Sequence, residues 1–244
     1  MRRIWQLMTS LETGLALLLA LCIAMATGSF LLAGEAAASI NAMPLLVWLV
    51  EVPASWSWWL WLSLAVLALL AVNTLLCSLE VVQARWSRAG LLPLAAPQLI
   101  HAGFLMILLA HGISAVGASR IQYEVFEGSV ARFPGGQQFG VAAISIAHAP
   151  SGMPTGFSGE LVPNLSYPTE RVTVSPNRPW FSYGYGVYIK QAAEFPYRRA
   201  LLEIHREPGA GMALAGSLLF AAGCAVLLWL RGTSRGAGSA GGRV

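Results

Sequence analysis

The sequence predicts an α-helical membrane protein with four transmembrane helices and a small external β-rich domain between the third and fourth helices. Hydrophobic residues make up 56% of the 244 residues and charged residues only 11%, whereas soluble domains carry about a quarter charged residues. Four apolar segments reach the roughly 20 residues that a membrane span needs. The stretch before the last segment instead has short apolar and β-branched runs separated by Gly, Pro, Ser and Asn, which is typical of strands and turns.

The predicted spans are approximately residues 15–33, 57–79, 99–116 and 211–230. The first also has features of a secretory signal peptide, because Arg2 and Arg3 precede an apolar run and residues 24–26 read Ala-Met-Ala. The run continues to Leu32, however, which is longer than the apolar region of a typical signal peptide. We therefore expect an uncleaved first helix and a three-plus-one arrangement around the external domain.

Charge in the short flanks predicts the orientation. Seven arginines lie before the first span, between the second and third spans, or after the fourth: Arg2, Arg3, Arg85, Arg88, Arg231, Arg235 and Arg243. Residues 34–53, between the first two spans, contain no Lys or Arg. The positive-inside rule then places both termini in the cytoplasm and residues 118–208 outside, since long domains cross regardless of charge. We expect the inner membrane of a bacterium.

The domain prediction has four parts. Residues 1–117 form a three-helix membrane region with an interfacial loop at 34–56, and residues 118–208 form the external β-rich domain. Residues 209–231 form the fourth transmembrane helix, and the Gly/Ser/Arg-rich residues 232–244 form a disordered cytoplasmic tail. In the loop, residues 45–50 predict an interfacial helix or a cover over the helix bundle, and Trp56, Trp58 and Trp59 fit an aromatic belt.

Five runs in the external domain predict five to seven short strands in a small sandwich or sheet. They are RIQYEVFEG, FGVAAISIAH, ERVTVSP, YGVYIKQAA and ALLEIHRE.

Composition and motifs exclude several classes of function. The net charge of +4 is diffuse, so we expect no nucleic acid partner. Cys22, Cys77 and Cys224 lie in apolar segments without CxxC or CxxCH, which argues against a disulfide framework, thiol redox chemistry and covalently attached haem. No P-loop or HExxH motif is present, and we assign no catalytic residue.

The third span, within QLIHAGFLMILLAHG, carries His101 and His111. Histidines are uncommon in spans and by default indicate a functional site. Ten residues separate the two by about 15 Å and turn them some 80° apart, so one iron cannot bind both from a straight helix. Each is either a ligand or a hydrogen-bonded side chain. We expect His148 at the surface and His205 solvated, with His205 beside His111 at an outer site as the alternative.

Five stretches resemble the ResB/CcsB family of System II cytochrome c biogenesis. In chain order they are TSLETGLALLLALCIAMATGSF, SWSWWLWLSLAVLALLAVNTLLCSLE, HAGFLMILLAHG, VTVSPNRPWFSYGYGVYIKQA and EIHREPGAGMALAGSLLFAAGCAVLLWL. The second ends in a pattern at Asn73, Thr74 and Cys77, and the third begins with histidine and a small residue. The external domain is short for this family, which leaves room for a reduced homologue that serves another pathway.

The resemblance implies haem transport across the membrane and its presentation to apocytochrome c, together with a CcsA-type membrane partner. It implies that His101 is an axial ligand of a non-covalent haem b, paired with a ligand from the partner. His111 has no counterpart in the family pattern. Alone the chain would be no enzyme, but a subunit of a cytochrome c synthase type complex.

Two alternatives stay open. One is a membrane b-type cytochrome subunit that passes electrons between quinone and an external c-type cytochrome, with His101 and also His111 as ligands. The other is a structural subunit that anchors a partner complex in membrane lipid. The second axial position at His101 is empty, filled by a weaker ligand such as Met106 of a second copy, or filled by a partner subunit.

Overall fold

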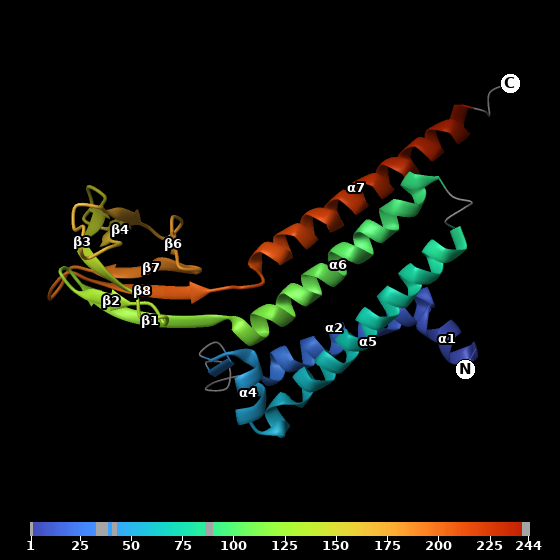
Figure 1. Cartoon of the computed structure of the whole chain (residues 1–244), viewed down its shortest axis with the longest axis horizontal. Coiled ribbons are helices and arrows are strands. Elements are labelled where there is room, and N and C mark those ends of the chain that lie inside the picture. The colour runs from blue at the N-terminus through green and yellow to red at the C-terminus, as the bar shows by residue number, and fades with distance from the viewer. Residues whose placement is uncertain (1, 33–38, 41–42, 86–89, 241–244) are drawn as a thin grey trace. The chain divides into compact units, whose positions relative to one another are not determined.

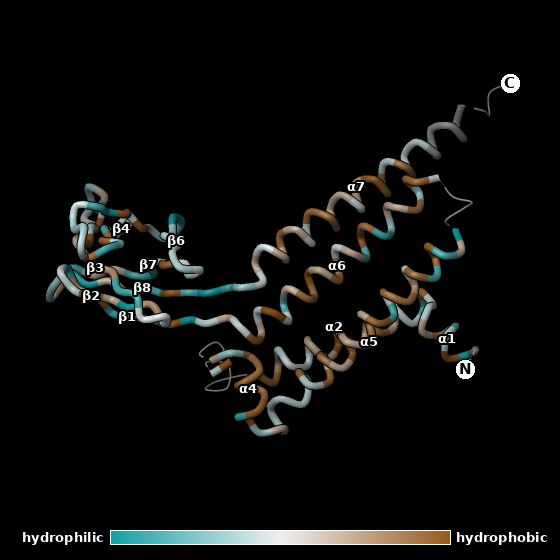
Figure 2. Tube along the Cα trace, in the orientation of Figure 1, coloured by the Kyte–Doolittle hydropathy of each residue, from teal (hydrophilic) through white to brown (hydrophobic). Residues whose placement is uncertain are grey.

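The computed structural model describes residues 2–32, 39–40, 43–85 and 90–240. The chain divides into a helical unit, residues 1–116 with 209–244, and a β unit, residues 117–208 (Figure 1). Four helices are long and apolar enough to cross a membrane, as predicted, and Figure 2 shows hydrophobic residues along them. They are α2 (Leu11–Leu31), α5 (Ala54–Arg85), α6 (Leu91–Gly117) and α7 (Ala210–Ala240).

The first half of the helical unit packs α2 against α5. A short helix, α1 (Arg2–Met8), precedes α2, and Asn73 of α5 holds the break between them. The buried Asn73 amide donates hydrogen bonds to the carbonyl oxygens of Met8 (2.7 Å) and Ser10 (3.2 Å). Carbonyls at a helix end lack intrahelical partners, so Asn73 supplies a donor to Met8 at the end of α1. The Ser10 carbonyl also accepts a hydrogen bond from the Gly14 amide.

The predicted interfacial helix is α4 (Leu45–Glu51). Its Trp48 is fully buried and donates to the Ser39 hydroxyl at 2.9 Å. The expected aromatic belt stays a prediction, and only two of its three tryptophans are exposed. Trp56 and Trp58 are exposed, but Trp59 is buried with its indole against Gly28 of α2, because a glycine there leaves room for a large ring.

The second half of the helical unit pairs α6 with α7 along small residues spaced seven apart. Gly209, just before α7, and Gly216 and Gly223 of α7 face the backbone at Ala110, Gly103 and Ala96 of α6, respectively. A Cβ atom at Gly216 would lie 2.9 Å from the Gly103 carbonyl oxygen. Small residues let spans approach backbone to backbone. We call these six positions the α6–α7 seam, and their order makes the two helices antiparallel.

Two four-stranded antiparallel sheets form the β unit. One has the order β1 (Ser119–Phe126), β8 (Arg199–Arg206), β7 (Tyr185–Ala193), β6 (Trp180–Ser182). The other has the order β2 (Val130–Arg132), β3 (Gln138–His148), β4 (Pro154–Val162), β5 (Val172–Val174). The shared core includes Phe133, Phe139, Ile144, Leu161, Ile189 and Leu202.

The structure differs from two sequence predictions. The β unit has eight strands rather than five to seven. Strands β2, β4 and β6 lie outside the five strand-like runs, because β2 and β6 are only three residues long and β4 is rich in Gly, Pro and Ser. Helix α7 continues to Ala240, whereas a disordered tail was expected from residue 232. Three glycines give residues 232–240 a low intrinsic helix propensity, but extending an existing helix avoids the unfavourable nucleation step. Residues 241–244 of that expected tail lie outside the described residues.

Candidate functional site

His101 lies on α6 and contacts α5 through its side chain. Its Nδ1 atom is 2.7 Å from the Ser78 hydroxyl, and the residue is half-buried. Gly103, which faces α7, follows two residues later, which corresponds to a rotation of about 160° around the helix. Because Gly103 faces α7, the His101 side chain points away from α7 and toward α5.

Ser78 engages one ring nitrogen and leaves the other available. When Nδ1 carries the proton, it donates to the Ser78 oxygen, and Nε2 presents a lone pair. No hydrogen bond from Nε2 to another described residue is found. An imidazole held through one nitrogen with the other open is the usual arrangement of a metal-ligating histidine.

Gln98 lies one turn before His101 on the same helix. Its side-chain Nε2 is buried and has no hydrogen-bond partner among the described residues. Leaving a buried amide donor unpaired costs about 1–3 kcal/mol. Residues three apart lie on neighbouring positions of one helix face, so Gln98 adds an unused donor near the imidazole. Its chemistry suits an acceptor such as a carboxylate.

His111 does not join this site. Its side chain is exposed, and Nδ1 donates to the carbonyl oxygen of Ile107 at 2.8 Å, one turn back on α6. The hydrogen bond expected for His111 is therefore made to its own helix rather than to a neighbouring one. Nothing in the described residues brings it near His101.

The two remaining histidines are in the β unit. His205 of β8 has its Nε2 atom 2.9 Å from a Glu207 carboxylate oxygen and its ring beside Tyr188. His148 ends β3, with Nε2 3.8 Å from Glu194. Both have carboxylate neighbours on the protein surface. An outer site shared by His111 and His205 would join the two units and stays a prediction.

No cluster of three or more His, Cys, Asp or Glu side chains suited to a metal ion occurs within the described ranges. An iron bound at His101 would therefore take a single histidine ligand from this part of the chain. Sequence reasoning missed Ser78 and Gln98. Their signal was present, because polar side chains within apolar spans are costly and tend to be functional.

Comparison with known proteins gives little help. No protein-family model and no curated protein matches the chain. Among solved structures, the chain is similar to one named Cytochrome c Heme Lyase CcmF, with 18% sequence identity and a TM-score of 0.43. The similarity covers 90% of this chain and 35% of the other, so the chain spans about a third of that protein's length. This TM-score is below the level that establishes a common fold.

Proposed function

We propose that this chain is a membrane subunit of a cytochrome c biogenesis complex, where it helps to carry haem across the membrane and present it to apocytochrome c. The observation that carries the proposal is His101, half-buried in an apolar helix with Nδ1 at Ser78 and Nε2 open. The resemblance of the chain to the ResB/CcsB family in the order of its segments supports the same role.

The residues around His101 fit a haem b. Nε2 of His101 would be the axial ligand, and the unpaired Gln98 amide would donate to a propionate carboxylate. When bound, haem b supplies an iron that changes oxidation state and takes axial ligands. The chain itself contributes the ligand, the Ser78 contact that orients it, and an apolar surround that limits water.

A second axial ligand has to come from elsewhere in such a complex. Of the histidines, only His101 and His111 lie in the candidate spans, and His111 faces another direction. We propose a CcsA-type membrane partner as its source, with Met106 of a second copy as the weaker alternative. The complex would lie in the bacterial inner membrane with both termini of this chain in the cytoplasm.

The first prediction concerns His101. His101→Ala should abolish the visible haem spectrum of the complex purified with its native partners, because the ligand is gone. His111→Ala should leave most of that spectrum, and it is the matched control on the same helix. A wild-type, six-coordinate spectrum in His101→Ala would overturn the assignment.

The Ser78→Ala variant tests whether Ser78 orients the His101 imidazole for haem binding. Second-sphere partners of metal-bound histidines typically contribute about 10- to 100-fold in affinity, so the variant should bind haem more weakly and show a shifted reduction potential. Ser63→Ala is the control, since the Ser63 hydroxyl donates a hydrogen bond to the Trp59 carbonyl oxygen of the same helix. Equal haem affinity and potential in Ser78→Ala and wild type would show that the contact has no such role.

The electron-transfer alternative predicts that His101→Ala stops a different cellular process. If His101→Ala removes haem and cells stop maturing c-type cytochromes, biogenesis is supported. If those cytochromes mature normally while quinol oxidation fails, the chain is a b-type cytochrome subunit. If neither process changes and the purified complex holds no haem, the chain only anchors its partners.

A further inference from the structure

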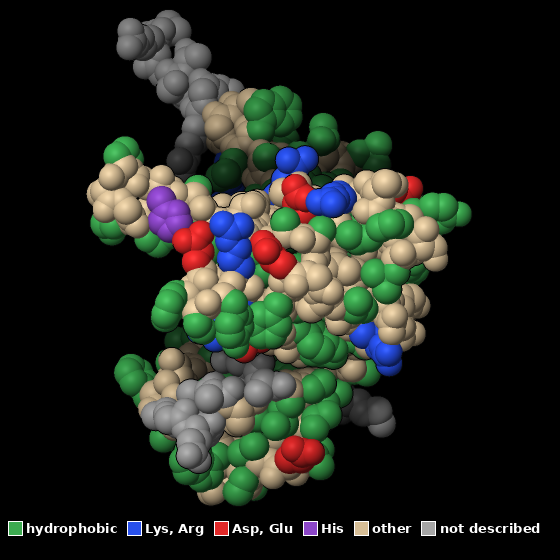
Figure 3. Space-filling view, turned by 90° about the vertical axis from the view of Figure 1, so that its left-hand side faces the viewer, with side chains coloured by type: hydrophobic (Ala, Val, Ile, Leu, Met, Phe, Trp, Pro, Cys, Tyr) green, Lys and Arg blue, Asp and Glu red, His purple; other side chains and the backbone are tan. Residues whose placement is uncertain are grey.

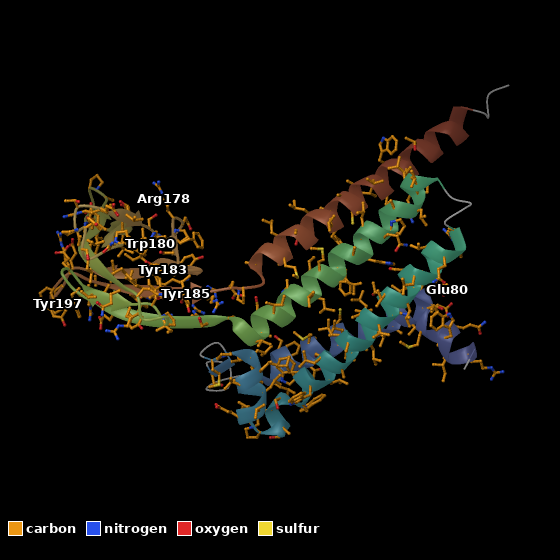
Figure 4. The ribbon with its side chains drawn as sticks, viewed as in Figure 1. Glu80, Arg178, Trp180, Tyr183, Tyr185 and Tyr197 are labelled. Carbon is orange, nitrogen blue, oxygen red and sulfur yellow. The ribbon has the colours of Figure 1, made fainter. Side chains whose placement is uncertain are left out.

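One end of the β unit carries both connections to the helices. β1 begins at Ser119 and β8 ends at Arg206, and these residues are paired in the sheet. Gly186 of β7 pairs with His205 of β8, so the β6–β7 turn at residues 183–184 lies at the same end. We call this the connection end. Figure 4 shows Tyr183 and Tyr185 on this side of the unit and Tyr197 at the opposite end.

Exposed aromatic side chains gather at the connection end. Tyr183 is 63% exposed and Phe181 is 70% exposed. Behind them, Phe133 contacts Tyr183 edge-on, with ring centroids 5.7 Å apart, and also contacts Trp180 and Tyr185. Tyr183 therefore stands on a packed aromatic base, and Phe181 contacts Tyr188 edge-on with ring centroids 6.4 Å apart.

The turn itself is unusual. Tyr183 has φ of 52° and Gly184 has φ of 77°. Such two-residue turns favour Asn, Asp or Gly in the first position, and a bulky residue with positive φ is rare. Strain of this kind is retained where it serves a function, here the display of an aromatic ring at the tip.

Unpaired arginines accompany these rings. Arg206 lies over the Tyr185 ring, 5.9 Å from its centroid, and Arg132 directly precedes Phe133. All residues of the β unit are described, and neither arginine has a carboxylate within ion-pair distance.

At the opposite end of the β unit, Arg198 and Arg199 are neutralised, as Arg120 is by Glu203 near the connection end. Arg198 lies 3.7 Å from Glu127, and Arg199 lies 2.9 Å from Glu124. Figure 3 shows such basic and acidic side chains next to one another.

Chain length keeps the connection end near the ends of two candidate spans. Only Ala118 separates α6 from β1, and only residues 207–209 separate β8 from α7. An extended residue covers at most about 3.6 Å. The first residue of β1 is thus within about 7 Å of the end of α6, and the last residue of β8 within about 14 Å of the start of α7. Span ends lie at the headgroup region of a bilayer.

We propose that Phe181, Tyr183, Arg132 and Arg206 form a surface that contacts anionic phospholipid headgroups. Aromatic rings favour the membrane interface, and basic side chains near an anionic membrane surface are attracted to it. The contact would steady the external domain against the bilayer, and it is independent of haem binding.

Tyr183 and Tyr197 allow a matched test, because they are exposed to similar extents at opposite ends of one unit. Tyr183→Cys and Tyr197→Cys are made in a full-length chain with Cys22, Cys77 and Cys224 replaced by Ala. Each is labelled with a polarity-sensitive fluorophore in nanodiscs of phosphatidylcholine alone or with phosphatidylglycerol. Phe181→Cys replaces the first variant if that one fails to fold.

Lipids with a quencher at the headgroup should quench the label at residue 183 but not the label at 197. Phosphatidylglycerol should increase that quenching, and Arg132→Gln with Arg206→Gln should remove the increase. Equal quenching at both sites, or none at 183, overturns the proposal. If quenching at residue 183 is equal with and without phosphatidylglycerol, the anionic headgroup is overturned as the partner. Protection of residue 183 from aqueous iodide without lipid quenching would identify a protein partner instead.

Discussion

Glu203 is a buried carboxylate that three donors from neighbouring strands enclose. Its side chain is 3% exposed and receives hydrogen bonds from Arg120 and Gln122 of β1, while Lys190 of β7 lies 3.3 Å away. Burial by itself raises the pKa of Glu203, but the hydrogen bonds from Gln122, Arg120 and Lys190 and the charge of Arg120 outweigh burial and lower that pKa. The carboxylate is therefore charged in the folded state at neutral pH.

Glu203→Gln should lower the free energy of unfolding of the β unit at pH 7 by about 1–3 kcal/mol, because two cations lose a charged acceptor. A lowered pKa contributes stability that is present above the unfolded value near 4.5 and lost as pH falls through the folded value. The difference between the variant and wild type should therefore shrink below about pH 4.5.

Hydrogen exchange of β1 and β8 amides in the full chain measures this difference. Glu160→Gln is the control, since Glu160 bonds the exposed Arg171 on the outer surface, and such pairs contribute little. A Glu203→Gln effect that is the same at pH 7 and pH 3 would rule out the charge as its origin.

At the scale of elements, the α6–α7 seam sets how closely two spans approach. Gly216→Leu should separate the helices, because its Cβ would already lie about 3 Å from the Gly103 carbonyl and the Ile107 backbone. Inserting volume into a close contact costs about 1–3 kcal/mol. Gly211→Leu is the control on the same helix, where a Cβ meets nothing within 4 Å.

Thermal unfolding in detergent should show a lower midpoint for Gly216→Leu than for Gly211→Leu. The same order is expected for Gly103→Leu and Gly112→Leu on α6, since Gly112 is also open. If Gly216→Leu has the same unfolding midpoint as Gly211→Leu, and Gly103→Leu the same as Gly112→Leu, the α6–α7 seam does not hold the two helices together.

The seam also shows where sequence reasoning stops at this scale. Its seven-residue spacing can be read from the sequence, but the pairing of Gly216 with Gly103 depends on an antiparallel register that spacing alone does not give.

Strand β4 was also not predicted from the sequence. PTGFSGELV has low β propensity, yet it pairs with both β3 and β5.

At the scale of the whole molecule, four crossings, if all four candidate helices span the membrane, would place both ends of the helical region on one side of it. Reporter fusions after Arg85 and after Gly152 should report opposite compartments, with Arg85 in the cytoplasm. A fusion after Leu230 should match the one after Arg85 and is the internal control. The same compartment for Arg85 and Gly152 would contradict four crossings.

The spans were the most predictable part of the molecule, because lipid requires long apolar helices whatever their partners. The β-rich nature of the segment between α6 and α7 was also predictable from its alternating runs. Within the candidate site, His101 stood out as a polar residue in an apolar run. Its contact with Ser78 did not, because hydropathy does not determine how α5 and α6 face each other.

The seam has a consequence for how the β unit folds. Gly209 lies against Ala110, and its amide donates to the Ser114 hydroxyl, so the helix pair holds together the two ends of a segment of about 90 residues. Bringing such ends together in a free chain costs about 4 kcal/mol in entropy. Once α6 and α7 have paired, the strands fold as a loop that is already closed. Strands β1 and β8, next to the ends, are then the first long-range pair within reach, and a loosened seam should slow their pairing.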